Sequence, residues 1–532
     1  MQKKNKEQMY NGFKLISLEL RNTTIMNKSN ITYKFIEDED NQELIYTTVL
    51  IGVNGTGKSN LFRIVIELLK ELHDLSNNKS RDYNIDGQFN LKFSLDNYVY
   101  EYTNMDYMSN QVTSKVNTAN LLRNGVKVDY KEAKFPNAIV ANSIMLTDKY
   151  PFFKKEKSSD GKKVETFPQY KYLGVRNIAQ SASTRAYVRK TVEFIAQEFN
   201  SDIFIKGLSS AANFLDLDET IEIYYYTINT HKFFKGNLTP KILRDYFEEM
   251  KKKYPNAEDN PPFKLNYYLK SQDDVNFIES VCGFCNILFN DNQLIQSNNK
   301  HDTTRKIVYN LFNKKSFTKL NNDYTMLENL RQLGMISAPE IQLNKSGYSL
   351  QESSSGEYHF FSSIVGLLAT VKENSLVFID EPEISLHPNW QMKYLTFIRE
   401  LFSGPEYATS HILVATHSHF LISDLKADSS KIIGLKKESG KIKIVNIPEN
   451  IDTFGWSPDD ILYNVFDVVS SRNKFVAEDI ANILDTLSNG SIDQKNKIER
   501  KTYDTLIHLE KSLKNNDPLK EVVKSILKKV IK

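Results

Sequence analysis

Gly52-Val-Asn-Gly-Thr-Gly-Lys-Ser59 is the stretch that decides the fold of this chain. It follows an apolar, β-branched run that ends at Ile51, and it precedes a segment, Leu61 to Leu72, whose apolar residues recur at helical spacing. Glycines let the backbone of such a turn curl until its N–H groups point inward, and the helix that follows contributes the positive end of its dipole. A strand, a glycine-rich turn and a helix in this order predict a phosphate-binding loop.

The phosphate loop predicts the contacts to a nucleoside triphosphate. Lys58 is expected to reach the β- and γ-phosphates of ATP, and the Ser59 hydroxyl is expected to ligate Mg²⁺. The other residues predicted to contact ATP are Asn54, Gly55, Thr56, Gly57 and Asn60. The alternative is a glycine-rich turn with a solvent-exposed lysine, which the match at every fixed position of the motif disfavours.

Two carboxylates end a second apolar strand, Ser375-Leu-Val-Phe-Ile-Asp-Glu-Pro-Glu383. The carboxyl end of a buried strand faces the crevice where α/β sheets bind ligands. Asp380 is therefore expected to hold Mg²⁺, directly or through water, and Glu381 to orient or deprotonate the attacking water. The alternative, a turn that merely carries two carboxylates, is disfavoured by the phosphate loop in the same chain.

A third apolar strand, Leu413-Val-Ala-Thr-His-Ser-His419, ends in polar residues. His417 would lie at the tip of this strand, where it could form a hydrogen bond to the γ-phosphate. Two alternatives stay open: His417 and His419 could be a metal pair, which would need further ligands, or they could be exposed loop residues.

Small residues precede a strongly apolar helix, Phe360 to Val371, in Gln351-Glu-Ser-Ser-Ser-Gly-Glu-Tyr-His-Phe-Phe361. By themselves Ser354 or Ser355 could be N-caps that satisfy free N–H groups. Because this segment precedes the acidic strand, it is also predicted to form a second phosphate-facing surface. One monomer is not expected to fold that surface onto its own phosphate loop.

In this order the motifs resemble those of the ABC-type ATPase superfamily, in the branch that holds RecF, the SMC proteins and the OLD family. The resemblance implies a homodimer or a higher even oligomer, in which Ser354 and Gly356 of one subunit cap the ATP that the other subunit holds. The family elements map onto a signature at Ser353–Glu357, a Walker B strand at Leu376–Asp380, a catalytic Glu381, a D-loop at Ile384–Pro388 and a switch histidine at His417.

Within that branch the chain resembles ATPases of bacterial anti-phage systems, such as the Septu and retron-associated ones. The phrases that carry this likeness are Phe135-Pro-Asn-Ala-Ile-Val-Ala-Asn-Ser143, Tyr170-Lys-Tyr-Leu-Gly-Val-Arg176 and Thr453-Phe-Gly-Trp-Ser-Pro-Asp-Asp-Ile-Leu462. The sequence departs from the family at two points. The stretch that often ends in a Mg²⁺-contacting Gln offers Asn142 and Ser143, and His419 stands where Pro is usual.

A nuclease centre like that of OLD proteins is not expected in this chain. Those proteins carry a C-terminal Toprim domain with a Glu followed by a D-x-D pair. After His417 the chain offers Asp459-Asp460 and Asp493, which lack the strand context of such a centre. Nuclease activity, if present, is therefore expected in a separate protein.

The bulk composition restricts the partners. The chain has 532 residues and a formal net charge of +3, so DNA binding would need a local basic patch. No signal peptide and no apolar run long enough for a membrane span is found, and a cytoplasmic location is expected.

Cys282 and Cys285 could be a redox pair or half a zinc site, but they are interpreted as reduced core thiols of a buried helix.

The expected fold class is α/β, an ABC-type ATPase core with a P-loop mixed sheet and a β meander. Residues 1–178 and 336–450 are expected to form this core. Residues 179–335 are predicted to be a mostly helical insertion that contains one strand, Glu222-Ile-Tyr-Tyr-Tyr-Thr-Ile228, and residues 451–532 a helical tail. The heptad repeat of a coiled-coil arm is absent from the insertion.

Three functions remain open from the sequence. The first is a sensor or regulator that uses ATP to control a separate nuclease or toxin effector in phage defence. The second is a RecF- or SMC-like ATPase that acts directly on DNA in repair. The third, the motor subunit of a membrane transporter, fits poorly with the Glu383-to-Pro388 stretch and the large insertion.

Overall fold

The computed structural model of the chain describes most of its residues. These are 12–36, 45–80, 85–105, 119–145, 147–153, 155–157, 163–174, 176, 184–197, 201–217, 220–254, 262–291, 294–296, 305–345, 348–349, 355–384, 386–423, 425, 429–445, 500–512 and 518–530. Several residues named above lie outside the described ranges, among them Ser353 and Ser354 of the predicted signature, and the stretch from Thr453 to Asp493.

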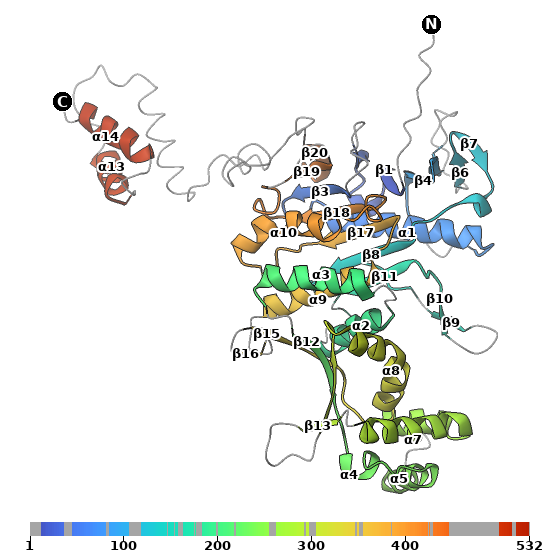
Figure 1. The fold of residues 1–532 in the computed structure, drawn as a ribbon. Coiled ribbons are helices and arrows are strands. Elements are labelled where there is room, and N and C mark those ends of the chain that lie inside the picture. Colours follow the sequence, from blue (N-terminus) through green and yellow to red (C-terminus); the bar gives the residue numbers. More distant parts are fainter. Residues whose placement is uncertain are drawn as a thin grey trace. The chain divides into compact units, whose positions relative to one another are not determined.

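A seven-stranded sheet is the central sheet of the unit Met1–Gly455 (Figure 1). Its strand order is β11-β8-β17-β18-β3-β19-β20, and all neighbours run parallel except the final pair. The strands are β3 (Tyr46–Gly52), β8 (Ala138–Ser143), β11 (Tyr170–Gly174), β17 (Ser375–Asp380), β18 (His411–Thr416), β19 (Ser430–Glu438) and β20 (Lys441–Val445). Every residue of β3, β8, β17 and β18 is buried, as expected for parallel strands that are covered on both faces.

A second sheet, of six antiparallel strands, packs with helix α1 (Lys58–Ser76) against one face of the central sheet. Its order is β2-β1-β4-β5-β6-β7, formed by β1 (Lys14–Arg21), β2 (Ile31–Lys34), β4 (Gln88–Leu95), β5 (Tyr98–Thr103), β6 (Asn120–Arg123) and β7 (Val126–Val128). Apolar residues of both sheets and of α1 share one core, in which the rings of Phe62 and Phe378 lie 4.9 Å apart. The short elements of this part of the chain are η1 (Thr24–Met26), η2 (Tyr130–Glu132), and β9 (Lys155–Lys157) and β10 (Lys163–Glu165), which pair with each other.

Four helices lie near the other face of the central sheet, where α3 and α9 run side by side (Figure 1). They are α2 (Thr184–Ala196), α3 (Ser201–Leu215), α9 (Ser355–Thr370) and α10 (Pro388–Leu401). Phe214 of α3, Phe360 of α9 and Phe397 of α10 stack closely, and the Phe214 and Phe397 ring centroids are 4.3 Å apart. The predicted signature helix is therefore packed against both the insertion and the helix that follows the acidic strand.

The insertion combines helices with a sheet that the sequence predicted only in part. Helices α4 (Thr230–Phe233), α5 (Pro240–Lys253), α6 (Phe263–Ser271), α7 (Val275–Asn290) and α8 (Lys314–Gln332) accompany α2 and α3. The expected strand is β12 (Ile221–Tyr226), and it is one of five antiparallel strands in the order β13-β14-β12-β15-β16. The insertion also contributes β13 (Leu294–Gln296) and β14 (Arg305–Asn310), whereas β15 (Glu340–Lys345) and β16 (Tyr348–Ser349) follow residue 335, its predicted end. Cys282 and Cys285 are free, buried thiols of α7, and burial raises the pKa of Cys282 to about 11.

The two sheets of the core are joined by buried polar contacts at the start of β18. The ammonium of Lys14, 1% exposed, donates to the carbonyls of Ala408 and Ser410 at 2.9 and 3.1 Å. The Leu15 N–H donates to Nδ1 of His411 at 3.1 Å, so Nε2 carries the proton and donates to the Thr48 hydroxyl at 2.9 Å. Burial and the charge of Lys14 hold the pKa of His411 well below its usual value, and the ring is neutral.

The chain forms two compact units, Met1–Gly455 and Trp456–Lys532. In the second unit α13 (Arg500–Ser512) packs against α14 (Pro518–Val530), with Leu506, Leu509 and Val523 buried. None of the described helices is long and apolar enough to cross a bilayer. The expected α/β fold class is confirmed, whereas the four-part division of the chain stays a prediction.

Candidate nucleotide-binding site

The strand order brings three of the sequence motifs to one edge of the central sheet. Strands β17, β18 and β3 are consecutive neighbours, and their parallel register aligns Asp380 with Ala415 and Thr416 with Ile51. The residues that follow each strand therefore emerge together, at the carboxyl edge where α/β proteins bind ligands. The phosphate loop, the acidic pair and the predicted switch histidine meet at this edge, although 321 residues of sequence separate Ser59 from Asp380.

The backbone of the phosphate loop adopts left-handed conformations at two of its glycines. Gly55 and Gly57 have φ angles of 81° and 86°, in the left-handed region that favours glycine. A Cβ at position 57 would lie 3.0 Å from the terminal side-chain atoms of Met26 and Ile442, so a larger residue there would also require these side chains to shift. Asn54 and Gly55 are exposed, whereas Thr56 is buried and its hydroxyl donates to the Val53 carbonyl at 2.9 Å.

Asn60, predicted to contact ATP, has a structural partner. Its side-chain amide donates to the Ile25 carbonyl of η1 at 3.3 Å and so links the first turn of α1 to the six-stranded sheet. Asn60 therefore holds the loop in place in this structure, and a direct contact to ATP stays a prediction.

Lys58 lies at the centre of the site and is 4% exposed. Its Nζ donates to the Gly52 carbonyl at 2.9 Å, lies 2.8 Å from Nε2 of His417, and is 3.7 Å from Oε1 of Glu381. Burial lowers the pKa of Lys58, and the neighbouring carboxylates oppose that shift. The lysine predicted to hold the phosphates thus touches the histidine and the glutamate predicted to act on them.

Glu381 is turned toward the histidine by an unusual backbone conformation. Its φ is 51°, a left-handed value that costs a non-glycine residue roughly 1–2 kcal/mol. The Glu381 N–H donates to the Ala415 carbonyl at 2.9 Å, and Oε1 lies 2.9 Å from Nε2 of His417. Burial alone would raise the pKa of Glu381, but hydrogen bonds with His417 and Glu383 and the Lys58 charge hold it below its usual value. Glu381 is therefore ionised at neutral pH, as a general base must be.

Asp380 and Ser59 fit a magnesium ion. The Ser59 hydroxyl donates to Oδ1 of Asp380 at 3.1 Å, whereas Oδ2 of Asp380 is buried and has no hydrogen-bond partner in the described structure. Burial raises the pKa of Asp380 to about 7, a shift that a bound cation would reverse. Among the described residues no group of three or more His, Cys, Asp or Glu could hold a metal. A single carboxylate with a hydroxyl suits Mg²⁺, which commonly takes its other ligands from phosphates and water.

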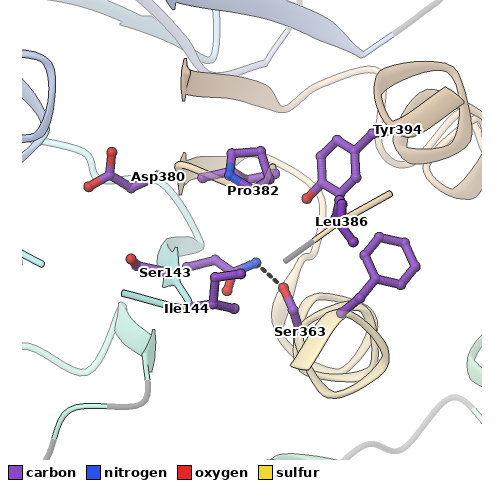
Figure 2. Close-up of a pocket in the computed structure, with 10 residues that line it drawn as sticks. Ser143, Ile144, Ser363, Asp380, Pro382, Leu386 and Tyr394 are labelled. Carbon is purple, nitrogen blue, oxygen red and sulfur yellow. Dashed lines mark hydrogen bonds between the residues drawn. The ribbon is translucent and has the colours of Figure 1, made fainter. Parts of the chain in front are cut away.

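A small cavity of about 10 Å³, enough for about one water molecule, lies beside Asp380 (Figure 2). Asp380 and Ser143 line it on the sheet side, and Ser363 of α9 lines it on the helix side. The Asn142 amide nitrogen donates to the Ser363 hydroxyl, and its oxygen has no partner in the described structure. Asn142, which stands where the family often has Gln, therefore lies near the acidic residue and contacts the signature helix.

The structure also brings in residues that sequence reasoning missed. Oε1 of Glu383 accepts from the His417 N–H at 2.7 Å and from the Thr416 hydroxyl at 2.8 Å. Oε1 of Gln391 accepts from the Ser418 hydroxyl at 2.6 Å. The spacing Glu381-Pro382-Glu383 was the available signal, because a proline within a tight turn can bring two carboxyls together. The rings of His419 and Phe420 lie 4.1 Å apart at an interplanar angle of 36°.

Gly356, predicted to cap ATP in the partner subunit, is buried in the first turn of α9. Ser354, its predicted companion, lies outside the described residues. The action of this signature across a dimer stays a prediction.

Comparison with known proteins supports the assignment made from the motifs. Residues 326–423 match a family model described as "AAA domain, putative AbiEii toxin, Type IV TA system". The Septu protein PtuA of Bacillus thuringiensis is 25% identical over 169 residues, which is 32% of this chain and 39% of that protein. The chain thus spans well under half the length of this curated relative, and the sequence resemblance indicated by the motifs is confirmed over this part.

Solved structures with partial similarity include an SMC head bound to the C-winged helix domain of ScpA and the recombination mediator RecF. Each is 13% identical, with TM-scores of 0.29 and 0.27. The alignments cover 81% and 82% of this chain, and 96% and 100% of those chains. Scores this low carry no argument about function, and the fold assignment rests on the strand order of the chain itself. The sequence matches show that the chain is similar to an AAA-domain family over residues 326–423 and to PtuA over 169 residues.

Proposed function

We propose that this chain binds and hydrolyses MgATP as a homodimer or higher even oligomer, and that it regulates a separate nuclease or toxin effector in anti-phage defence. The observation that supports ATP hydrolysis is the convergence of Lys58, Asp380, Glu381 and His417 at one sheet edge. The regulatory role rests on the similarity to PtuA and on the absence of a predicted nuclease motif.

In the proposed reaction each residue has a defined task. The N–H groups of the phosphate loop and the Lys58 ammonium bind the β- and γ-phosphates. Mg²⁺, held by Ser59 and Asp380, would neutralise charge on these phosphates. Glu381 accepts a proton from the water that attacks the γ-phosphorus, while the bond from that phosphorus to the bridging oxygen breaks and ADP leaves. His417, next to both Lys58 and Glu381, would donate a hydrogen bond to the γ-phosphate.

A mixing experiment tests the shared site. Gly356→Asp places a carboxylate near the γ-phosphate of the partner's ATP, so it should abolish hydrolysis while leaving ATP affinity nearly intact. Lys58→Ala damages the site of its own chain. In a mixed dimer one composite site carries both lesions and the other carries neither, so the mixture should recover part of the ATPase rate. No recovery at any mixing ratio would contradict a dimeric site.

The partner proposal is tested by expression of the intact operon. The chain should co-purify with a nuclease or toxin, and the absence of any companion would reject this role. Deletion of residues 516–532 removes α14 and tests whether the tail is the dock, since a truncated chain that still retains its effector would exclude it. Tight binding of the chain alone to DNA ends, weakened by salt, would instead support a RecF-like function.

A further inference from the structure

The side-chain amide of Gln391, in the first turn of α10, connects two segments that border the candidate site. Its Nε2 donates hydrogen bonds to the main-chain carbonyls of Leu386 at 2.9 Å and of Glu383 at 3.4 Å, both in the turn after β17. Its Oε1 accepts a hydrogen bond from the Ser418 hydroxyl at 2.6 Å, in the loop after β18. One amide therefore binds the turn after the acidic strand with its nitrogen and the loop of the switch histidine with its oxygen.

The start of α10 determines where this amide lies. His387 is the N-cap of the helix, and its Nδ1 accepts from the Asn389 N–H at 3.3 Å. The Gln391 N–H donates to the His387 carbonyl at 3.1 Å, which places Gln391 one turn into the helix. Because helical side chains tilt toward the N-terminus of their helix, the Gln391 amide is directed back at the turn that the chain has just left.

The hydrogen bonds of Ser418 extend this link to both neighbours of His417 in the loop. The Ser418 hydroxyl, besides donating to Gln391, accepts from the Phe420 N–H at 3.2 Å. The Ser418 N–H donates to the Thr416 hydroxyl at 2.8 Å. The backbone of His417 thus lies between two residues that are anchored by side-chain hydrogen bonds.

We propose that Gln391 is a positioning residue, which joins the turn after β17 to the loop after β18 and so holds the His417 ring against Lys58 and Glu381. The ring nitrogen Nε2 lies 2.8 Å from Nζ of Lys58 and 2.9 Å from Oε1 of Glu381. The His417 side chain is 32% exposed, so packing holds the ring only in part and the anchors of its backbone set its position. This inference rests on the proposed ATPase function, in which His417 contacts the γ-phosphate.

Two substitutions cut the link at different places. Gln391→Met has a similar length and lacks the amide, whereas Ser418→Ala removes only the hydroxyl at the other end. Each should lower kcat by about tenfold, because a displaced catalytic group loses much of its contribution. The KM for ATP should change by less than about threefold, since neither residue contacts the phosphate loop among the contacts described. Lys393→Gln, at an exposed position of the same helix, is the matched control and should leave both constants unchanged.

The double variant distinguishes a link from two independent packing defects. If Gln391 and Ser418 act through one hydrogen bond, the second substitution removes nothing that the first has left, and kcat should stay within about twofold of the slower single variant. Independent defects would multiply to a loss of about 100-fold. Multiplied losses, or a Gln391→Met variant with wild-type kcat, would overturn the proposal.

Hydrogen exchange tests the link without any turnover. Three N–H groups of the loop after β18, those of His417, Ser418 and Phe420, donate to side-chain oxygens, so their exchange reports on these anchors. In Gln391→Met, exchange within residues 413–423 should be about fivefold faster or more than in the wild type, and the matched control should not differ from the wild type. Unchanged exchange in Gln391→Met would overturn the proposal. Faster exchange together with an inactive wild type would support the link and reject the proposed hydrolytic function.

Discussion

His411 begins strand β18 and His417 directly follows it, and a buried lysine lies near each histidine. At the first end His411 and Lys14 bind mainly the fixed groups of the fold, namely the Leu15 N–H and the carbonyls of Ala408 and Ser410. At the other end His417 and Lys58 contact each other and Glu381, and the His417 side chain is 32% exposed. Similar residue types thus form a structural joint at one edge of the sheet and a reactive site at the other.

The difference between the edges lies in what their partners can do. The Leu15 N–H and the carbonyls of Ala408 and Ser410 are main-chain groups, which cannot rotate away as a side chain can, so these partners of Lys14 and His411 are fixed by the fold. The partners of Lys58 include side chains, which can exchange one hydrogen bond for another when a phosphate arrives. The buried ammonium groups of Lys14 and Lys58 are both tolerated because they are hydrogen-bonded. Only Lys58 can replace hydrogen bonds to side chains with contacts to a bound phosphate.

The largest expected effect is the loss of the base at the reactive edge. Glu381→Gln keeps the shape of the side chain and the Asp380 ligand but removes the carboxylate that accepts the proton. We expect kcat to fall by about 100-fold or more, with ATP binding retained and a longer-lived closed dimer. Phosphate release and size-exclusion chromatography with ATP measure these effects. Turnover of the Gln variant at the wild-type rate would exclude Glu381 as the base.

The two lysines provide a direct comparison of the edges. Lys58→Ala should weaken MgATP affinity by about tenfold or more, because it removes a charge-assisted contact to the phosphates. Lys14→Met should leave MgATP affinity unchanged and lower the melting temperature, because two buried carbonyls lose their donor. Calorimetric titration and thermal melting of both variants test the pair. Unchanged ATP affinity in Lys58→Ala would reject the phosphate-loop assignment.

The pH dependence of MgATP binding should reveal the protonation of the Asp380 carboxyl. Its pKa is raised to about 7, so the carboxyl is largely protonated at pH 6 and must release that proton to bind Mg²⁺. Apparent MgATP affinity should therefore decrease by up to about tenfold from pH 8 to pH 6. The matched measurement with ATP and EDTA should show a much smaller change. Equal pH profiles with and without Mg²⁺ would argue against Asp380 as a metal ligand.

The smallest effect on function is expected from the histidine at the structural edge. His411→Leu fills much of the same volume but leaves the Leu15 N–H without its acceptor, at a cost of about 1–3 kcal/mol in the free energy of unfolding. At a temperature where the variant is folded, kcat and MgATP affinity should match those of the wild type. Chemical denaturation and ATPase assays test this, and a lowered kcat in the folded variant would mean that the two edges are coupled.

Much of the core was predictable because its signals are local. The phosphate loop, its flanking strand and helix, and the acidic strand each show their chemistry within about ten residues. The hairpin of β19 and β20 is equally local, because it turns at Ser439-Gly440, where both residues have positive φ. The contacts of Glu383, and the different surroundings of His411 and His417 at the two ends of β18, were not predictable. They depend on which strands become neighbours, and local sequence patterns do not reveal strand order.

The insertion also contains elements that local sequence patterns do not predict. Its helices follow from apolar periodicity, and α5 begins where Thr239 caps it by accepting from the Ile242 N–H. Strands β13 and β16 have three and two residues, too few for a period-two pattern to be distinguished from a loop. Pairing across the sheet, not local preference, makes these segments strands.

The order of strands in the central sheet also affects how the chain is synthesised. Strand β3 pairs with β18 and β19, and Thr48 of β3 meets His411 across 363 residues of sequence. At a synthesis rate of about 5–20 residues per second, the phosphate-loop strand must wait roughly 20–70 s on the ribosome for its neighbours. During that interval an apolar strand with open edges is exposed to other nascent chains. ATP binding can therefore begin only after most of the chain has been translated, so a truncated product would be inert rather than partly active.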